Sequence, residues 1–154
     1  MVYYTRYPCP IGQLIMTSDG HSLTGLGFQL PEAQWEQRDD LPIFHSVRSW
    51  LDGWFSGNPG PVDFPLCPVG TAFQQRVWGL LGQIPYGETV TYGFLAGQLG
   101  AKMSAQAVGQ AVGKNPIALI IPCHRVVGAK GQLTGYAWGL ERKKWLLRHE
   151  EVTK

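Results

Sequence analysis

An apolar run that ends at a proline constrains the fold of this chain more than any other stretch. The run is Ile117–Ile121, with the sequence IALII, and Pro122 follows it. Five apolar residues suit a buried strand but not a membrane span, which needs about 20. Because Pro122 cannot donate a ladder hydrogen bond and favours an extended Ile121, we predict a buried strand over 117–121 that stops at the proline.

Three polar or reactive side chains, Cys123, His124 and Arg125, come directly after this predicted strand. Positive charge beside a cysteine lowers the pKa of its thiol and favours the nucleophilic thiolate. A cysteine in this position can equally be a buried, inert core residue beside two polar neighbours. The Cys-His pair alone leaves both interpretations open.

A stretch rich in proline and glycine divides the chain. Residues 57–68 contain four prolines and two glycines, a composition typical of a linker. We therefore predict an N-terminal domain over 1–69, which includes this linker, and a C-terminal domain over 70–154.

Charge is distributed unevenly between these two parts, although the net charge is only +2. Residues 1–69 carry three arginines against seven carboxylates, a balance of −4. Residues 70–154 carry ten lysines and arginines against four glutamates, a balance of +6. The second part is the one that could bind a polyanion, although a solvated basic surface would have the same balance.

The N-terminal part predicts a small sheet and one helix. Weak alternation and turn signals predict strands over 2–7, 13–18 and 22–28, with turns at 8–12 and at Asp19-Gly20. Apolar residues at helical spacing predict an amphipathic helix over 43–55, whose Trp50 and Trp54 we expect to pack on the sheet. The acidic stretch 31–40 is compatible with a loop or a short helix.

Hydroxyl cap residues mark three helices in the C-terminal part. The expected helices are 72–81 after Thr71, 92–99 after Thr91, and Ser104 to about Gly113. A loop over 101–103 separates the last two. Two short helices joined by a turn that contains glycine fit a helix-turn-helix, although any helical corner has the same pattern.

The last of these helices is built mainly from small residues, namely Ala105, Ala107, Gly109 and Ala111. Ordinary recognition helices read bases in the major groove with Arg, Asn or Gln. A helix of small residues can instead press its backbone into the minor groove, which is about 6 Å wide. Small residues also allow tight helix packing, and both uses are compatible on opposite faces.

The stretch Gly70–Glu150 resembles the O6-alkylguanine-DNA alkyltransferase family. The matching segments are GTAFQQRVW, IPYGETVTY, AVGQAVGKNP, IPCHRVV, GY with a glycine shortly after, and KKWLLRHE, in family order. The resemblance implies an α+β fold, with a small ribonuclease H-like sheet-plus-helix domain followed by a mainly helical, winged-helix-like domain containing the helix-turn-helix. It also implies a DNA repair protein that flips O6-alkylguanine out of duplex DNA and transfers the alkyl group irreversibly to its own Cys123.

The resemblance assigns catalytic roles to Cys123, His124, Glu150, Tyr92 and Asn115. Adjacent residues do not face each other, so the thiol and the imidazole are expected to communicate through a bridging water, with Glu150 orienting His124. Tyr92 would help rotate the nucleotide and would protonate the leaving guanine. Asn115 would tie the helix end to the active-site loop. Without the family match, Glu150 would be a surface carboxylate, and Tyr92 could equally be a core tyrosine.

The resemblance also implies a guanine pocket. Backbone carbonyls of Cys123 and Val126 would accept the amino group of the base. The expected lid consists of Tyr136, Ala137, Trp138 and Gly139, with backbone N–H groups near Ala137 on the O6 side. A tryptophan at 138, where many members have a small residue, is expected to narrow the pocket.

The expected DNA-binding residues are Ser104, Ala105, Gln106, Ala107, Gly109 and Arg125. Gln106 stands where the family usually has an arginine that fills the space left by the flipped base. A glutamine can still hydrogen-bond there, but it carries no charge and reaches less far. Arg125 would be structural or would face a phosphate.

We expect double-stranded DNA containing O6-alkylguanine as the partner, with O4-alkylthymine as a further candidate lesion, and a monomeric protein that uses no cofactor and no membrane. The sequence has no CxxC or HxxxH pair and no ligand set for the zinc that some family members carry. An odd number of widely spaced cysteines, and an N-terminus without signal-peptide features, favour reduced thiols in a cytoplasmic protein.

Two other functions deserve comparison with alkyl transfer. A lesion-binding relative would flip the base without reacting, but such relatives lack the cysteine that this chain has at position 123. A Cys-His hydrolase would need an oxyanion hole and a leaving-group acid, and it would turn over repeatedly.

Overall fold

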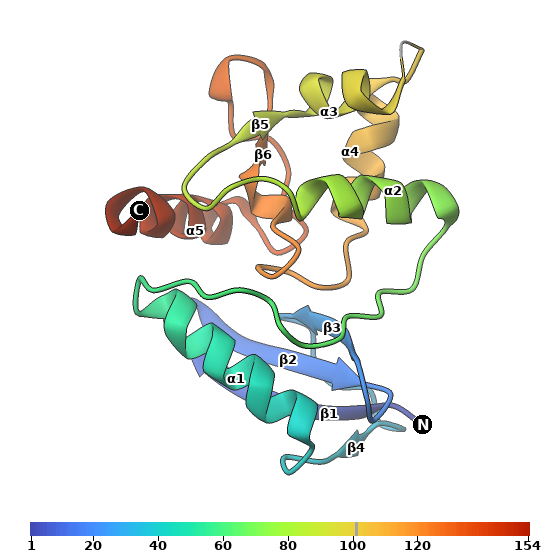
Figure 1. Ribbon diagram of the computed structural model, residues 1–154, viewed down its shortest axis with the longest axis vertical. Helices are drawn as coiled ribbons and strands as arrows, with labels where there is room; N and C mark the ends of the chain where they lie inside the picture. Colours follow the sequence, from blue (N-terminus) through green and yellow to red (C-terminus); the bar gives the residue numbers. More distant parts are fainter. Residues whose placement is uncertain (101) are drawn as a thin grey trace. The chain divides into compact units, whose positions relative to one another are not determined.

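The computed structural model describes residues 1–100 and 102–154. The chain divides into two compact units, Met1–Val69 and Gly70–Lys154. Both are drawn in Figure 1, and each is described by itself below. The loop expected over 101–103 includes residue 101, which lies outside the described residues.

The first unit contains a four-stranded sheet. Its strands are β1 (Tyr3–Cys9), β2 (Gly12–Ser18), β3 (Leu23–Gly27) and β4 (Glu36–Gln37), in the order β3-β2-β1-β4. The first three strands pair antiparallel, which confirms the predicted sheet. The turn between β1 and β2 is shorter than the predicted turn over 8–12, because β1 extends to Cys9. Strand β4 pairs parallel with β1 and was not predicted, since two polar residues carry no alternation that would reveal a strand.

Helix α1 (Pro42–Phe55) lies along this sheet, as Figure 1 shows. Its apolar stripe, which includes Phe44, Leu51 and Trp54, is fully buried and confirms the predicted amphipathic helix. Trp54 is therefore in the core as expected. Trp50 is only half-buried and donates its indole N–H to the carbonyl of Gly60 at 2.9 Å, so it binds the linker stretch.

The second unit contains the other helices, and three of them begin where the predicted cap residues stand. Helix α2 (Ala72–Leu81) follows Thr71, which forms a capping box with Gln74. Helix α3 (Tyr92–Leu99) follows the short strand β5 (Val90–Thr91), and helix α4 (Ala105–Gly113) follows Ser104. Helix α4 packs against both α2 and α3.

The strand expected over 117–121 is wrong, because this segment is a buried turn. The N–H of Ile120 donates to the carbonyl of Ala118 at 2.7 Å, and Leu119 between them has a φ of 66°. This is a γ-turn, a conformation that is rare for a residue with a side chain. The whole segment is buried, so its apolar run has no periodicity that separates a strand from a turn.

A second tight turn connects this segment to Cys123. Pro122 has φ −81° and ψ 67°, and the N–H of Cys123 donates to the carbonyl of Ile121 at 2.8 Å. These angles define an inverse γ-turn. The prediction that Pro122 ends the segment holds, and the turn directs the chain into the short 3-10 helix η1 (Cys123–Arg125).

The remaining elements complete the second unit. Strand β6 (Val126–Val127) pairs parallel with β5, and the 3-10 helix η2 (Ala129–Gly131) follows. Helix α5 (Leu140–Thr153) ends the chain and was not predicted as an element, since its charged sequence shows little apolar stripe. Within the described residues, the helices are too short or too polar to cross a bilayer.

Candidate active site

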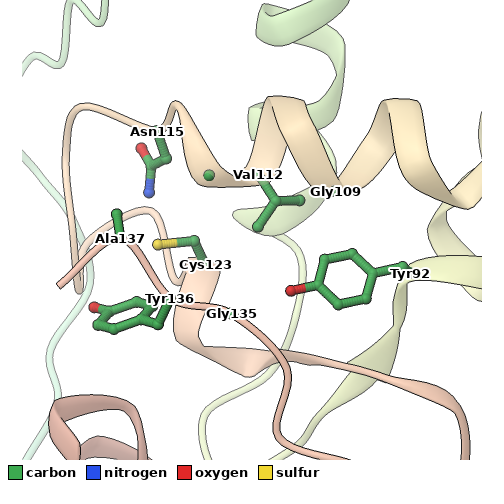
Figure 2. A pocket seen from close by; sticks show the side chains of 9 residues that line it. Tyr92, Gly109, Val112, Asn115, Cys123, Gly135, Tyr136 and Ala137 are labelled. Carbon is green, nitrogen blue, oxygen red and sulfur yellow. The ribbon is translucent and has the colours of Figure 1, made fainter. Parts of the chain in front are cut away.

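A cavity of about 290 Å³ opens in front of Cys123. Figure 2 shows that its walls come from helices α3 and α4, from the Cys123 turn and from the loop before α5. The residues that line it are Tyr92, Gly109, Val112, Gly113, Asn115, Cys123, Gly135, Tyr136 and Ala137. The fold thus brings together residues that lie up to 45 positions apart in the sequence.

Cys123 is the first residue of η1, and only 6% of it is exposed. Burial raises the pKa of its thiol, while the Asn115 side chain, the charge of Lys143 and the Tyr136 hydroxyl act in the opposite direction. The raised pKa means that the resting group is a thiol. Such a thiol needs a base before it can act as a nucleophile.

Asn115 holds the turn that presents Cys123. Its Nδ2 donates to the carbonyls of Ile117 at 3.2 Å and Ile121 at 2.7 Å, and its Oδ1 accepts from the N–H of Ile117 at 3.0 Å. These three bonds close the segment that contains the positive φ of Leu119. Asn115 therefore fixes the loop from one side while it lines the cavity from the other.

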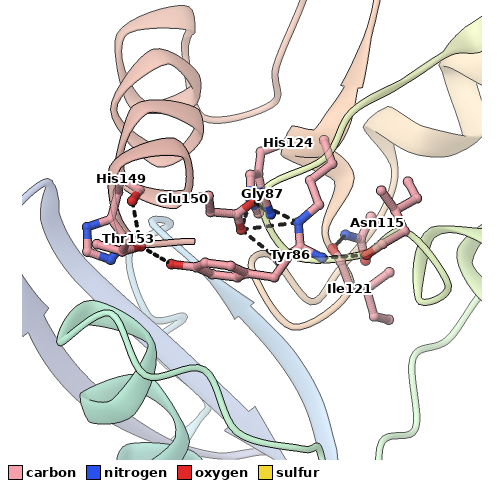
Figure 3. Close-up of polar contacts among 10 residues, drawn as sticks. Tyr86, Gly87, Asn115, Ile121, His124, His149, Glu150 and Thr153 are labelled. Carbon is pink, nitrogen blue, oxygen red and sulfur yellow. Dashed lines mark hydrogen bonds and ion pairs between the residues drawn. The ribbon is translucent and has the colours of Figure 1, made fainter.

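Behind the thiol lies a buried group of charged and polar side chains, which Figure 3 draws. His124 Nε2 and Glu150 Oε2 are 2.8 Å apart, and both residues are almost completely buried. The N–H of Gly87 donates to Glu150 Oε1 at 3.2 Å. Glu150 is thus an orienting acceptor in the protein interior, where the absence of solvent competition strengthens each of these bonds.

Arg125 belongs to the same buried group. Its Nε donates to Glu150 Oε1 at 2.9 Å, its Nη2 to Glu150 Oε2 at 2.7 Å, and its Nη1 to the carbonyl of Ile84 at 2.7 Å. The guanidinium also lies 5.5 Å from the ring centre of Tyr86. We name His124, Arg125 and Glu150 together the relay group.

Of the two roles expected for Arg125, this geometry fits the structural role and does not support contact with a DNA phosphate. Its guanidinium is buried, and the Glu150 carboxylate and the Ile84 carbonyl hold it inside the protein. A phosphate on the surface could not reach it without breaking an ion pair. The sequence offered no direct sign of this, because Glu150 lies 25 residues further along the chain.

The relay group sets the protonation of its members. Burial alone would raise the pKa of Glu150, but hydrogen bonds and charge from His124 and Arg125 lower it to about 2. Burial lowers the pKa of His124 below its ordinary value of 6.5, although Glu150 opposes this effect. At neutral pH the site therefore holds an ionised Glu150 and a neutral His124 that can accept a proton.

Tyr92 forms the wall opposite Cys123. Its ring packs against Gly109, where a Cβ would lie 3.6 Å from the ring edge. Figure 2 shows its phenol oxygen pointing toward the cavity. The small residue at 109 therefore leaves space for the tyrosine ring beside α4.

Residues 132–139, which we call the lid segment, close the cavity before α5 begins. Gly135, Tyr136 and Ala137 from this segment line the cavity. The Tyr136 hydroxyl is buried beside the Cys123 thiol, and burial raises its pKa well above the ordinary value. A polar group of this kind is suited to bind a ligand.

Comparison with known proteins identifies the family of this chain. Residues 72–152 match the DNA binding domain of 6-O-methylguanine DNA methyltransferase, and residues 2–68 match its ribonuclease-like domain. The chain belongs to the 6-O-methylguanine DNA methyltransferase family. The family and the α+β fold predicted from the sequence are therefore confirmed.

Individual members of the family match along nearly the whole chain. The methylated-DNA–protein-cysteine methyltransferase of Haemophilus influenzae is 45% identical, over 98% of this chain and 87% of that protein. The crystal structure of Mycobacterium tuberculosis O6-methylguanine methyltransferase has a TM-score of 0.90 and 45% identity, over 100% of this chain and 95% of that chain. The structure of Mycobacterium tuberculosis OGT in complex with DNA has a TM-score of 0.89 and 44% identity, over 98% and 94%.

The site residues that the family resemblance predicted lie in several parts of the second unit. Tyr92, Gly109, Asn115, Cys123, Tyr136 and Ala137 line the cavity. His124 and Glu150 lie behind it with Arg125. Val126 is buried in β6, while Trp138 and Gly139 belong to the lid segment but do not line the cavity.

Helix α4 presents two faces. Val108, Ala111 and Val112 are buried, and the indole of Trp78 donates to the carbonyl of Ala111 at 2.9 Å, so one face serves packing as expected. The remaining predicted residues are exposed or half-buried, namely Ser104, Ala105, Gln106, Ala107 and Gly109. Contact of this second face with DNA stays a prediction.

Sequence reasoning missed three cavity residues and one buried cation. Val112 and Gly113 lie three and four positions after Gly109, so helical spacing from Gly109 would have found them. Gly135 precedes the predicted Tyr136 directly. Lys143 is fully buried on α5, and no residue pattern marks it as different from its exposed neighbour Lys144.

Proposed function

We propose that this protein is a methylated-DNA–protein-cysteine methyltransferase, which flips O6-alkylguanine out of duplex DNA and takes the alkyl group onto Cys123. One observation carries the proposal: a buried thiol faces a cavity of about 290 Å³ and is backed by a neutral histidine that an ionised glutamate orients. Membership of the 6-O-methylguanine DNA methyltransferase family supports the same reaction.

The reaction is a displacement at the alkyl carbon. A bond forms between Cys123 Sγ and this carbon while the bond from the carbon to the guanine O6 breaks. His124 takes the thiol proton through a bridging water, and Glu150 stabilises the imidazolium that forms. The electron pair of the broken bond leaves with guanine, which receives a proton from Tyr92 so that a neutral base departs.

No proton is gained or lost by the site and its bound guanine as a whole. Tyr92, left as a phenolate, recovers a proton from the imidazolium, so the net change moves the thiol proton to guanine. The product is a thioether, from which water cannot readily displace the Cys123 thiolate, so the free thiol is not regenerated. Each molecule therefore reacts once, which distinguishes it from a hydrolase that turns over.

The charge distribution of the relay group supports this role. Glu150 has a pKa of about 2 and remains ionised throughout the physiological range. Arg125 balances the buried carboxylate, which would otherwise lose stability through desolvation. Asn115 supports the loop that carries the thiol, and the lid segment is suited to hold the flipped guanine, with backbone groups of Cys123 and Val126 as candidates for its amino group.

Recognition of DNA is proposed for the exposed face of α4. Ser104, Ala105 and Gln106 are exposed at its N-terminal end, and the small side chains of this helix fit the narrow minor groove. The balance of +6 over residues 70–154 favours a polyanion. The relative solved in complex with DNA supports DNA as the partner, and O4-alkylthymine remains a second candidate lesion.

Three broader proposals accompany this function. We assign base flipping and transfer to residues 70–154, and we regard residues 1–69 as a separate domain. A monomer suffices, because every residue of the proposed chemistry comes from one chain. Cytoplasmic location is supported by three cysteines that form no disulfide within the described residues.

Intact mass after incubation with duplex DNA that contains O6-methylguanine tests the proposal. We expect the protein to gain one methyl group, and peptide analysis to locate it on Cys123. No gain with tight binding would indicate a lesion-binding protein instead. Release of product beyond one equivalent would indicate a hydrolase.

A further inference from the structure

Lys143 is a buried ammonium that the proposed reaction leaves without a role. It lies on α5, one turn after the lid segment, and 0% of it is exposed. It takes part in none of the ion pairs found among the described residues. Burying a charge without a carboxylate partner is costly, so a lysine at such a place points to a function.

The contacts of Lys143 join two walls of the cavity. Its Nζ donates to the carbonyls of Gly135 at 3.2 Å and Thr134 at 3.4 Å, both in the lid segment. The same Nζ lies 6.0 Å from the ring centre of Tyr92 on the opposite wall. A single side chain therefore fixes the lid segment beside the tyrosine that faces Cys123.

The charge of Lys143 also acts on the groups behind the cavity. It lowers the pKa of the Cys123 thiol, against the effect of burial, and it lowers the pKa of His124. The first effect helps a thiolate to form, and the second keeps the imidazole neutral at rest. Burial lowers the pKa of Lys143 itself, and the neighbouring Cys123 opposes this.

We propose that Lys143 is a positioning residue for alkyl transfer, which fastens the lid segment over the cavity and fixes one positive charge near the Cys123 thiol. This inference rests on the proposed function and deepens it. The titratable groups around Lys143 are Cys123 and His124 on η1 and Tyr92 on α3. Among these, Cys123 gains negative charge when its thiol is deprotonated, and Tyr92 gains it when it protonates the leaving guanine.

The test compares Lys143→Met with Lys144→Met in the full-length protein. The control carries the same substitution one residue further along α5, where the side chain is 56% exposed and forms an ion pair with Glu141 at 3.5 Å. Two rates are measured for each folded protein. One is the single-turnover rate of methyl transfer from duplex DNA containing O6-methylguanine. The other is the alkylation of Cys123 by iodoacetamide across a range of pH, followed on the Cys123 peptide.

We expect Lys143→Met to slow methyl transfer by about tenfold or more, as for loss of hydrogen bonds from a charged group. We also expect the midpoint of its iodoacetamide profile to move to higher pH, because the thiolate loses a nearby positive charge. Lys144→Met should match the wild type in both rates. The second rate is the one that a merely structural lysine would leave unchanged.

The proposal is overturned if a folded Lys143→Met protein keeps either the wild-type transfer rate or the wild-type midpoint. Should that variant fail to fold, Lys143→Gln removes the charge and keeps an N–H donor for the lid carbonyls on a side chain that is one bond shorter. It must then show the same shift of the midpoint. The iodoacetamide profile needs no DNA, so it still decides the role of Lys143 if the wild type accepts no methyl group and the proposed function itself fails.

Discussion

The relay group behind Cys123 and the exposed face of α4 differ in burial and in charge. His124, Arg125 and Glu150 are buried, and charge-assisted bonds of 2.7 to 2.9 Å connect them. The α4 face consists of small or uncharged side chains, and Gln106 near its N-terminal end is exposed. Proton transfer requires fixed geometry, whereas the surface that we propose for DNA requires only fit and close approach.

The largest effect is expected at the nucleophile itself. Cys123→Ser should abolish methyl transfer, because a hydroxyl cannot replace the thiolate, while duplex affinity should stay at the wild-type value. Cys9→Ala and Cys67→Ala serve as controls, since neither residue lines the cavity, and both variants should still transfer. The measurement is the mass of each cysteine peptide, and a methyl group found on the Cys9 or Cys67 peptide would refute the assignment.

A large effect is also expected at Arg125. A substitution there should affect stability and transfer if Arg125 serves the relay group, and duplex affinity if it contacts DNA. Arg125→Met leaves Glu150 buried without its main cationic partner, which should cost about 3 to 5 kcal/mol of unfolding free energy. The melting temperature should fall by about 10 °C, and transfer should slow, but duplex affinity should not change.

The control for Arg125 is Arg76→Met, which removes an exposed arginine that donates to the carbonyl of Leu99 at 3.4 Å. It should change the melting temperature little. Calorimetry measures the melting temperature of each variant, and salt titrations measure its affinity for duplex DNA. If Arg125→Met kept its stability and lowered the salt slope by about one, the residue would contact a phosphate after all.

A smaller effect, confined to DNA, is expected at Gln106. Gln106→Arg should tighten duplex binding and steepen its dependence on salt by about one unit in slope, since one phosphate contact is added. Gln106→Ala should slow repair in duplex DNA but not transfer from the free modified base, which needs no flipping. Equal slowing on both substrates would mean that Gln106 supports the cavity or the fold. Gln110→Ala, at another exposed position of α4, is the matched control.

The smallest effect is expected at Trp138. The sequence predicts that its indole narrows the pocket, yet the structure does not include it in the cavity lining. Trp138→Gly should therefore change the ratio of benzyl to methyl transfer rates by less than the roughly tenfold that a direct pocket contact can give. A larger rise in this ratio would restore the original expectation.

Local signals predicted much of this fold. The caps at Thr71, Thr91 and Ser104 act over three residues, and each marked the start of a helix correctly. The turn over 117–121 was mistaken for a strand because side-chain bonds from Asn115 determine it, and an apolar pattern carries no information on those bonds.

Predictions for the site residues likewise succeeded where local motifs identify them and failed where distant contacts decide. Family motifs brought the prediction to Cys123, His124 and Glu150, and the structure joins the last two across 26 residues. The environments of Arg125 and Lys143 were not predictable, because their partners come from other elements of the fold. Burial of a cation depends on the assembled tertiary structure and leaves no periodic trace in the sequence.

The central claim is that a neutral His124, oriented by Glu150, removes the proton from a buried thiol. The most direct test is the single-turnover rate of methyl transfer as a function of pH. Burial lowers the pKa of His124 below 6.5, so the rate should fall only as pH drops through that lowered value and should be flat from neutral pH upward. A rate that instead keeps rising about tenfold per pH unit above pH 8 would follow the raised pKa of the thiol itself and would contradict base assistance by His124.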